Sequence, residues 1–441
     1  MKSWFAGVGL GAVLGVGFVG LSSVAWPQSE RADPRAEVYG KLGIFSEVLA
    51  FIESDYVTEV DSTEVIEAGI NGMLTSLDPH SSYLNPEDFR DIQVDTSGEY
   101  GGLGVEVVPS DGFVKVVAPI DDTPASRAGL KSGDLLTAIN GEQIVGRALN
   151  DAVKEMRGPA GTDITITVLR EGQDPFDVTL TREVIQPKSV RSRMEEGNIG
   201  YLRISGFNER TTLLLEESLA DIAEASGGRP NGLVIDLRNN PGGLLDQAVS
   251  VSDMFLSGGQ VVSTFGRHSS NDRPYNAGPG EVFAGVPIVV LINRGSASAA
   301  EIVAGALQDR KRGRVLGVTS FGKGSVQKVV PLGADRGALR LTTARYYTPS
   351  GRSIQGIGIE PDIEVAQERI SEEDLKKRTG NFSEANLPNA LENEEGVEVR
   401  EPHIPDDQPP EDYEGDDYQL DRALQLLRDP ATFASVEPRA G

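Results

Sequence analysis

The chain of 441 residues contains no cysteine and only three histidines, His80, His268 and His403. The absence of cysteine excludes disulfides, thiolate metal sites and lipid attachment through a thioether. A Ser-His-Asp triad would have to use one of the three histidines, and none lies in a catalytic motif, although the sequence alone excludes none of them. No two histidines lie within helical or hairpin reach of each other, so we expect no metal site and no cofactor.

Positive charge is also scarce. The chain has 41 Lys and Arg against 67 Asp and Glu, a formal net charge of −26, which argues against nucleic-acid binding because such binding needs a basic footprint. Much of the charge is local, since residues 366–416 hold 16 acidic and 5 basic side chains. We therefore expect residues 367–441 to form an acidic, low-complexity and disordered tail, with one short helix where Leu420, Leu424 and Leu427 recur at helical spacing.

The first 26 residues indicate export. They carry one early lysine, then an uncharged apolar run, and Ser23-Val-Ala25 precedes Trp26 as in a signal cleavage site. The run is also long enough to span a bilayer as an uncleaved anchor. We expect a periplasmic protein, and the choice between a cleaved signal peptide and an anchor stays open.

Residues 38–96 are predicted to be helical. Two apolar stripes, Leu42–Ile52 and Val65–Leu74, have the spacing of amphipathic helices. Such stripes pack against each other or against a second copy of the chain.

Residues 97–186 have the pattern of a small β-rich module, with short strands, turn glycines and one amphipathic helix. Near its start, Gly101, Gly102, Leu103 and Gly104 precede a strand. A glycine-rich loop leaves backbone N–H groups free to hold a carboxylate, and the strand after it can pair with an extended peptide. The alternative is an ordinary strand opening, and only the surrounding module favours peptide binding.

Residues 187–366 alternate strand and helix patterns, which predicts a largely parallel sheet covered by helices. The fold class is therefore α/β with an inserted β-rich module. Functional residues of such sheets gather at the carboxyl ends of the strands. Both Gly242-Gly243 and Ser298 follow buried strand patterns, so they are expected at that edge.

The stretch Asn293–Glu301 links the apolar run Ile288–Ile292 to a helical pattern, and it contains two serines, Ser296 and Ser298. A hydroxyl at the start of a helix lies where backbone N–H groups point outward, which suits a nucleophile. Ser298 and Glu301 also fit a capping box, so a purely structural role is the simpler interpretation of this turn alone. The residues by themselves do not choose between the two serines.

Lys323 lies between Gly322 and Gly324. Serine needs an adjacent base, and lysine serves as one only when burial lowers its pKa from about 10.4. A solvated loop lysine is the alternative. The segment Gly317–Lys323 also approaches a phosphate-binding loop, but Gly324 stands where that loop needs Ser or Thr, so an NTPase is weakly supported.

Several motifs occur together in one order, and their combination resembles the carboxyl-terminal processing peptidases, serine proteases with a Ser-Lys dyad. The resemblance extends from about residue 38 to 366. The motifs that carry it are Leu77-Asp-Pro-His-Ser-Ser-Tyr-Leu84, Asp236-Leu-Arg-Asn-Asn-Pro-Gly-Gly243, Ser296-Ala-Ser-Ala-Ala-Glu-Ile302, Phe321-Gly-Lys-Gly-Ser-Val-Gln327, Tyr346-Tyr-Thr-Pro-Ser-Gly351 and Gly356-Ile-Gly-Ile-Glu-Pro-Asp362.

The resemblance implies a role for each candidate. Ser298 would be the nucleophile, Lys323 its base and Gln327 the residue that orients the amine. The oxyanion donors would be the N–H groups of Ala299 and of one glycine of the pair, with Gly243 preferred.

The same resemblance identifies the β-rich module as a circularly permuted PDZ domain. It implies an exported serine endopeptidase that recognises free substrate C-termini and cleaves through an acyl-enzyme. Homo-oligomers formed through the helical N-terminal region are expected, and an adaptor protein is compatible with the family. The alternative function is a catalytically silent PDZ scaffold of the cell envelope. Whether the PDZ domain activates or inhibits is left open.

Overall fold

The computed structural model describes residues 34–110, 112–333, 335–371, 383–396 and 403–436. The chain divides into two compact units, Met1–Ile66 and Glu67–Gly441. The predicted signal peptide or anchor, residues 1–26, lies outside the described residues. No helix in the part of the chain that the structure describes is both long and apolar enough to cross a membrane.

The N-terminal region is helical, as predicted. Its apolar side chains are largely exposed in the monomer, including Leu42 and Val48, which are 54% and 51% exposed. Packing within the first unit therefore does not account for this stripe, and its part in an oligomer stays a prediction. The elements are α1 (Pro34–Asp55), α2 (Ser62–Thr75), β1 (Ser82–Leu84) and α3 (Pro86–Ser97).

The β-rich module has its own apolar core, built from its strands and one amphipathic helix. Its main sheet has the order β3-β4-β5-β7-β8, with β6 paired to β5, so β3 is an edge strand. The elements are β2 (Tyr100–Gly102), β3 (Val105–Ser110), β4 (Phe113–Pro119), α4 (Pro124–Arg127), β5 (Leu135–Ile139), β6 (Glu142–Gln143), α5 (Leu149–Met156), β7 (Asp163–Leu169), β8 (Phe176–Thr181) and β9 (Glu183–Ile185).

A six-stranded sheet with the order β10-β11-β12-β15-β16-β19 organises the core. Only the β10–β11 pair is antiparallel, so the prediction of a largely parallel sheet agrees with the structure. The strands are β10 (Val190–Glu195), β11 (Ile199–Ile204), β12 (Gly232–Asp236), β15 (Ile288–Ile292), β16 (Arg314–Gly317) and β19 (Ile363–Glu364).

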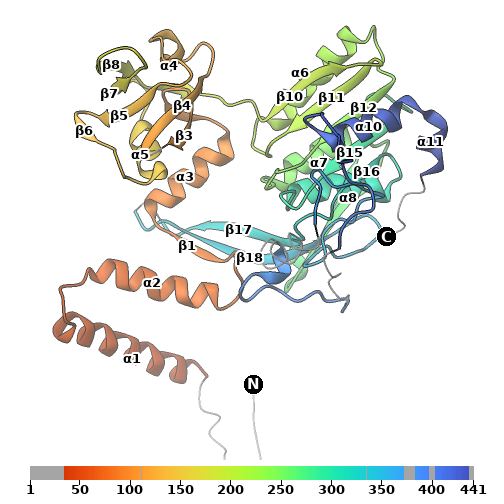
Figure 1. The fold of residues 1–441 in the computed structure, drawn as a ribbon. Coiled ribbons are helices and arrows are strands. Elements are labelled where there is room, and N and C mark those ends of the chain that lie inside the picture. The colour runs from red at the N-terminus through yellow and green to blue at the C-terminus, as the bar shows by residue number, and fades with distance from the viewer. Residues whose placement is uncertain (1–33, 111, 334, 372–382, 397–402, 437–441) are drawn as a thin grey trace, which may run out of the picture. The chain divides into compact units, whose positions relative to one another are not determined.

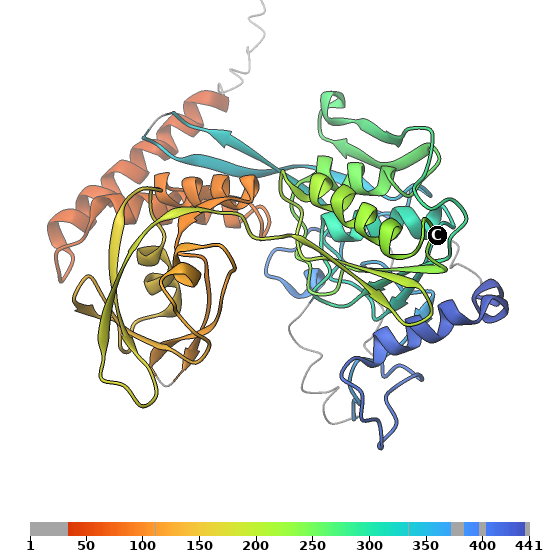
Figure 2. The same ribbon diagram turned by 90° about the horizontal axis from the view of Figure 1, so that it is seen from above.

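Helices cover both faces of this sheet (Figures 1 and 2). Successive residues of a strand point to opposite faces. Leu233 and Ile235 belong to the cluster with α6 (Thr211–Ala225), α7 (Leu245–Asp253) and α8 (Ala299–Asp309), while Val234 between them belongs to the cluster with α10 (Tyr418–Arg428). Every residue of β12 and β15 is buried in consequence.

A second, antiparallel sheet flanks the core and carries part of the candidate site. Its order is β1-β18-β13-β14, and β17 also pairs with β18. The strands are β13 (Gly259–Gly266), β14 (Arg273–Ala277), β17 (Ser325–Pro331) and β18 (Ala338–Tyr347), with the short helix η1 (Ser269–Asn271) between the first two.

The acidic C-terminal segment differs from the prediction of a disordered tail wherever the structure describes it. Glu384, in the short helix η2 (Glu384–Asn386), is fully buried, and its carboxylate lies 2.8 Å from Nε2 of His80 and accepts a 2.9 Å bond from Gln355. Helix α10 buries the predicted stripe of leucines against the core sheet, and α11 (Pro430–Ser435) follows it. The composition of the segment predicted that it is solvated, but its leucines in α10 pack against the core sheet and its Glu384 is buried and hydrogen-bonded.

Candidate active site

The turn after β15 holds Ser298 in an unusual backbone conformation. Its φ is 55° and its ψ is −115°, outside the regions that residues with a side chain ordinarily adopt. Helix α8 begins at the next residue, Ala299. Such strain persists only where the surroundings enforce it, and here it presents a partly buried hydroxyl at the start of a helix.

The structure separates the two serines of this turn. Ser296 is completely buried, its hydroxyl donates a 2.8 Å hydrogen bond to the carbonyl of Leu237, and it accepts a 3.0 Å bond from the N–H of Asn293. Its oxygen therefore ties the turn to the end of β12. Ser298 is left as the serine with a hydroxyl available for chemistry, which spacing alone could not decide.

The carboxylate of Glu301 connects the nucleophile turn to the lysine loop. One oxygen accepts hydrogen bonds from the N–H groups of Ser298, at 2.7 Å, and Lys323, at 2.9 Å. The other oxygen accepts from the Ser320 hydroxyl and the Gly322 N–H, each at 2.6 Å. Glu301 is fully buried, and burial raises its pKa to about 7 while these four hydrogen bonds act in the opposite direction. The sequence pattern identified this residue only as a helix cap.

Lys323 lies partly buried in the loop before β17. Burial lowers its pKa below 10.5, and the positive charge of Arg340 lowers it further. The carboxylates of Glu384, Glu301 and Asp78 act in the opposite direction, so the net direction is downward. A lysine in such a position has a larger neutral fraction than a solvated one, which is what a general base requires.

Gln327, on β17, is oriented by its neighbours. Its Nε2 donates to the hydroxyls of Ser325, at 2.9 Å, and Thr342, at 3.1 Å. Thr342 in turn donates a 3.0 Å bond to Asp78. Because the amide donor is used in this way, its oxygen is the atom left to accept a hydrogen bond from an amine.

The glycine pair approaches the nucleophile closely. A Cβ at Gly242 would lie 2.7 Å from Cβ of Ser298 and 2.9 Å from the nitrogen of Ala299, so only glycine fits there. The N–H of Gly242 donates to the side chain of Asn240 at 2.9 Å. Within the described residues, the N–H groups of Gly243 and Ala299 donate no hydrogen bond. This difference favours Gly243 over Gly242 as a donor to an incoming oxyanion.

Tyr346, on β18, is a neighbour of the nucleophile for which the sequence gave no role. It is 2% exposed, and its hydroxyl lies against the Ser298 side chain without a hydrogen bond of ordinary geometry. Burial raises its pKa well above 10, so the hydroxyl stays protonated. Its only sequence signal was membership of the Tyr346–Gly351 motif.

The predicted peptide site is narrower than the sequence suggested. Gly101 and Gly102 lie in β2, which pairs with β9, so the loop itself is Leu103-Gly104. The N–H groups of Leu103 and Gly104 have no acceptor in the described chain, whereas both carbonyls are bonded. The edge strand β3 follows directly. Two backbone N–H groups without an acceptor in the described chain therefore lie directly before an edge strand.

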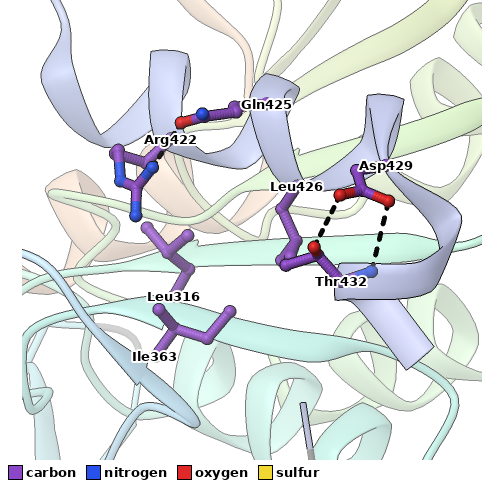
Figure 3. Close-up of a pocket in the computed structure, with 7 residues that line it drawn as sticks. All are labelled: Leu316, Ile363, Arg422, Gln425, Leu426, Asp429 and Thr432. Atoms are coloured by element: carbon purple, nitrogen blue, oxygen red, sulfur yellow. Dashed lines mark hydrogen bonds between the residues drawn. The ribbon is translucent and has the colours of Figure 1, made fainter. Parts of the chain in front are cut away.

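A cavity of about 120 Å³ lies elsewhere, between α10, α11 and the neighbouring strands β16 and β19 (Figure 3). None of the predicted site residues lines it. Its polar side chains are already engaged, since Asp429 accepts hydrogen bonds from Thr432 and Arg422 pairs with Asp407. We assign it no part in the chemistry.

Glu301→Gln is expected to lower the cleavage rate by about 100-fold or more, because an amide NH₂ would face N–H donors and move both loops. The variant also leaves buried N–H groups without acceptors, at about 1–3 kcal/mol each, so its melting temperature should fall. Steady-state cleavage and thermal melting measure the two effects. A folded variant with the wild-type rate would show that Glu301 is a helix cap and nothing more.

Models of known protein families match three parts of the chain. Residues 198–365 match the model of peptidase family S41, residues 115–170 match a PDZ domain, and residues 22–88 match the N-terminal domain of the activating protease CtpB.

Individual relatives match over most of the chain. A carboxy-terminal-processing protease of Bartonella bacilliformis is 46% identical over 429 residues, 96% of either chain. The carboxy-terminal processing protease CtpA of Bacillus subtilis is 34% identical over 315 residues, 71% of this chain and 66% of the relative. Among solved structures, a photosystem II D1 C-terminal processing protease is 29% identical, with a TM-score of 0.44, covering 79% of this chain and 92% of its own.

Proposed function

This chain belongs to the carboxy-terminal-processing proteases of peptidase family S41, and we propose that it cleaves exported proteins with a Ser298–Lys323 dyad after capturing their free C-termini. It is a serine-type peptidase with a PDZ domain. One observation carries the proposed dyad: a single buried carboxylate, that of Glu301, binds the backbone N–H groups of both Ser298 and Lys323. The turn that contains Ser298 and the loop that contains Lys323 are thereby bonded to the same carboxylate.

The proposed reaction begins with a proton transfer. The neutral amine of Lys323 takes the proton of Ser298 as its oxygen attacks the scissile carbonyl, and Gln327 holds the resulting ammonium through its amide oxygen. The N–H groups of Gly243 and Ala299 stabilise the oxyanion, aided by the positive end of the α8 dipole. The lysine then protonates the leaving amine, and an acyl-enzyme remains on Ser298.

Water completes the cycle. It loses a proton to the neutral amine as it attacks the ester carbonyl, and the ammonium returns a proton to the departing Ser298 oxygen. Serine, the neutral amine and a new carboxylic acid result, and the acid releases its proton to solvent as a carboxylate. The chain requires no metal in this scheme.

The test is direct detection of the acyl-enzyme. The purified protein is mixed with a peptide substrate, quenched in acid after milliseconds to seconds, and analysed by mass spectrometry. We expect the mass of the N-terminal substrate fragment minus water on the tryptic peptide that contains Ser298. Peptide hydrolysis with an adduct on a different residue, or with none at any quench time, would contradict the mechanism.

A catalytically silent scaffold is the alternative function. It requires a missing nucleophile, base or orienting residue, whereas the chain has Ser298, Lys323 and Gln327, and the Glu301 carboxylate binds the backbone of the first two. Cleavage by the wild-type chain and none by Ser298→Ala would exclude it.

Substrate capture is proposed for the PDZ domain. The N–H groups of Leu103 and Gly104 would hold the terminal carboxylate, and the peptide would pair with the edge strand β3. Val105 and Val107 on β3, with Val153 on α5, line the apolar core beside this edge and suit apolar terminal residues.

Amidating the C-terminus of a peptide is expected to weaken its binding by about tenfold or more, because the amide loses the charge that the two N–H groups would hold. Binding is measured by fluorescence anisotropy with Ser298→Ala, which does not consume the peptide. A peptide that ends in aspartate, with its α-carboxylate free, controls for the apolar side chain. Equal affinity of free and amidated peptides would overturn the proposed capture mode.

Export is proposed from residues 1–26, whose charged start and apolar run are those of a secretory signal. Sequencing the N-terminus of the protein from a periplasmic fraction distinguishes cleavage before Trp26 from retention as an anchor. Recovery only in the cytoplasm would contradict export.

A further inference from the structure

Arg238 is a buried cation between the core strand β12 and the glycine pair Gly242-Gly243. It follows the last residue of β12 by two positions, and it is 9% exposed. Its guanidinium donates to both oxygens of Asp236, at 3.0 and 2.6 Å. A buried arginine needs an opposite charge and acceptors for its five N–H donors, and the carboxylate of Asp236 alone does not supply enough acceptors.

Asp417 supplies the second half of this environment from the far end of the chain. Its two oxygens accept from Nη1 and Nη2 of Arg238, both at 2.7 Å, which is a bidentate pair. Asp417 is also the N-cap of α10, where it accepts a 3.1 Å bond from the N–H of Leu420. Gln419 and Gln367 accept further bonds from Nη1 at 3.2 and 3.4 Å.

The charges around this point are balanced only with Asp417 included. Asp236 is shared, because it also pairs with Arg203 at 3.0 Å and accepts a 2.8 Å bond from Tyr201. Two carboxylates therefore face two guanidinium groups. Without the charge of Asp417, Arg238 would compete with Arg203 for a single carboxylate.

Arg238 begins the segment that ends at the oxyanion glycine. After it, Asn239 has a φ of 51°, and the buried Asn240 bonds the carbonyl of Ile204 and the N–H of Gly242. The carbonyl of Asn240 also accepts a 2.9 Å bond from the N–H of Ala297, next to the nucleophile. Because these hydrogen bonds make the segment rigid, a movement of Arg238 would also move the glycine pair.

We propose that Asp417 is a positioning residue for the oxyanion hole: by clamping Arg238, it fixes the segment that presents the Gly243 N–H to the substrate. This inference rests on the proposed function, since it concerns the same oxyanion. It makes the C-terminal helix α10 part of the catalytic machinery. The leucines of α10 pack against the core sheet, and the carboxylate of Asp417 at the start of the helix binds Arg238.

Asp417→Asn is the main test, because asparagine is nearly isosteric and caps a helix as well as aspartate does. Asp429→Asn is the matched control: Asp429 is the N-cap of α11, is bonded to Thr432 (Figure 3), and lies at the opposite end of α10 from Asp417. We expect kcat of Asp417→Asn to fall by about tenfold or more, because donor misplacement acts on the transition state. KM should stay within about twofold, and Asp429→Asn should match the wild type.

Two further readouts separate positioning from stability, and both are taken well below the melting temperature. The inhibition constant of a peptide boronate, whose adduct occupies the oxyanion hole, should rise in Asp417→Asn in parallel with the loss of kcat. The pH profile of kcat/KM should keep the wild-type midpoint, since the lysine is untouched. Wild-type kcat and boronate affinity in folded Asp417→Asn would overturn the proposal, as would equal losses in Asp429→Asn.

The outcome is distinguishable from a failure of the proposed function. If wild-type protein cleaves and Ser298→Ala does not, the dyad stands whatever Asp417 does. Should Asp417→Asn fail to fold, Asp417→Glu keeps the charge but cannot both cap α10 and meet Arg238 in the same geometry. Its kcat should also fall, with KM unchanged, and a folded Asp417→Glu variant with wild-type kcat would contradict the inference.

Discussion

Ser298→Ala is expected to abolish peptide cleavage, with a loss of about 10⁴–10⁶-fold, because no other hydroxyl in the turn is free to attack. The fold should be unaffected. The bond from the Ser298 N–H to Glu301 uses the backbone and survives the substitution. Loss of any capping by the hydroxyl costs about 0.5–2 kcal/mol at most. Cleavage of a fluorogenic peptide and thermal melting report the two properties separately.

Ser296→Ala is the matched control, and it should behave in the opposite way. Its hydroxyl bridges the Leu237 carbonyl and the Asn293 N–H inside the protein. Removing it leaves buried groups without partners, at a cost of about 1–3 kcal/mol, so the melting temperature should drop while turnover below that temperature persists. An inactive, fully stable Ser296→Ala beside an active Ser298→Ala would reverse the assignment.

Lys323→Arg is expected to be as inactive as Lys323→Ala. Arginine keeps the positive charge but remains protonated at any working pH, so it cannot accept the serine proton. If the lysine acted only as a fixed charge near the oxyanion, the arginine variant would keep much of its rate. The two variants are compared with wild type in cleavage assays, and an intact melting transition controls for the bulk of the guanidinium. A folded Lys323→Arg enzyme with most of the wild-type rate would refute the base assignment.

The same assignment fixes the direction of the pH dependence. The amine is inactive below its folded pKa, where it is protonated, and active above it. The cleavage rate should therefore rise with pH through one ionisation, and burial together with Arg340 places that ionisation below the usual pKa of 10.5. A rate that falls as pH rises through this range, measured as kcat/KM, would contradict the neutral-amine mechanism.

The three central strands of the core sheet and the helices between them could be predicted from the sequence, because their burial is encoded locally. Ile288–Ile292 is an uninterrupted apolar run, and it forms β15 with the same bounds. The leucine stripe before residue 428 is a helical repeat, and it forms α10. What α10 covers could not be predicted, because its partner strands β12, β15 and β16 end about 100 or more positions before it begins, and an apolar stripe does not specify what it packs against.

The tail shows the limit of composition. An excess of acidic residues predicts solvation on average. The fully buried Glu384 nevertheless contacts His80 and Gln355, and the partly buried Asp417 forms an ion pair with Arg238. Their locations follow from partners that the local sequence does not contain. The average charge of the segment therefore does not show that Glu384 and Asp417 are buried.

The sequence by itself singled out Ser298, Lys323 and Gln327 as candidates because they lie in local motifs, and the resemblance to a known family supplied the role proposed for each. The family resemblance chose Ser298 and Gly243, and only the tertiary structure showed a physical difference between them and Ser296 and Gly242. In each pair the two residues are chemically alike, and they differ in which one has its polar group taken by a neighbour from another strand or loop. Hydrogen-bond partners of that kind are set by the three-dimensional packing, and so is the buried carboxylate of Glu301 that brings the two loops together.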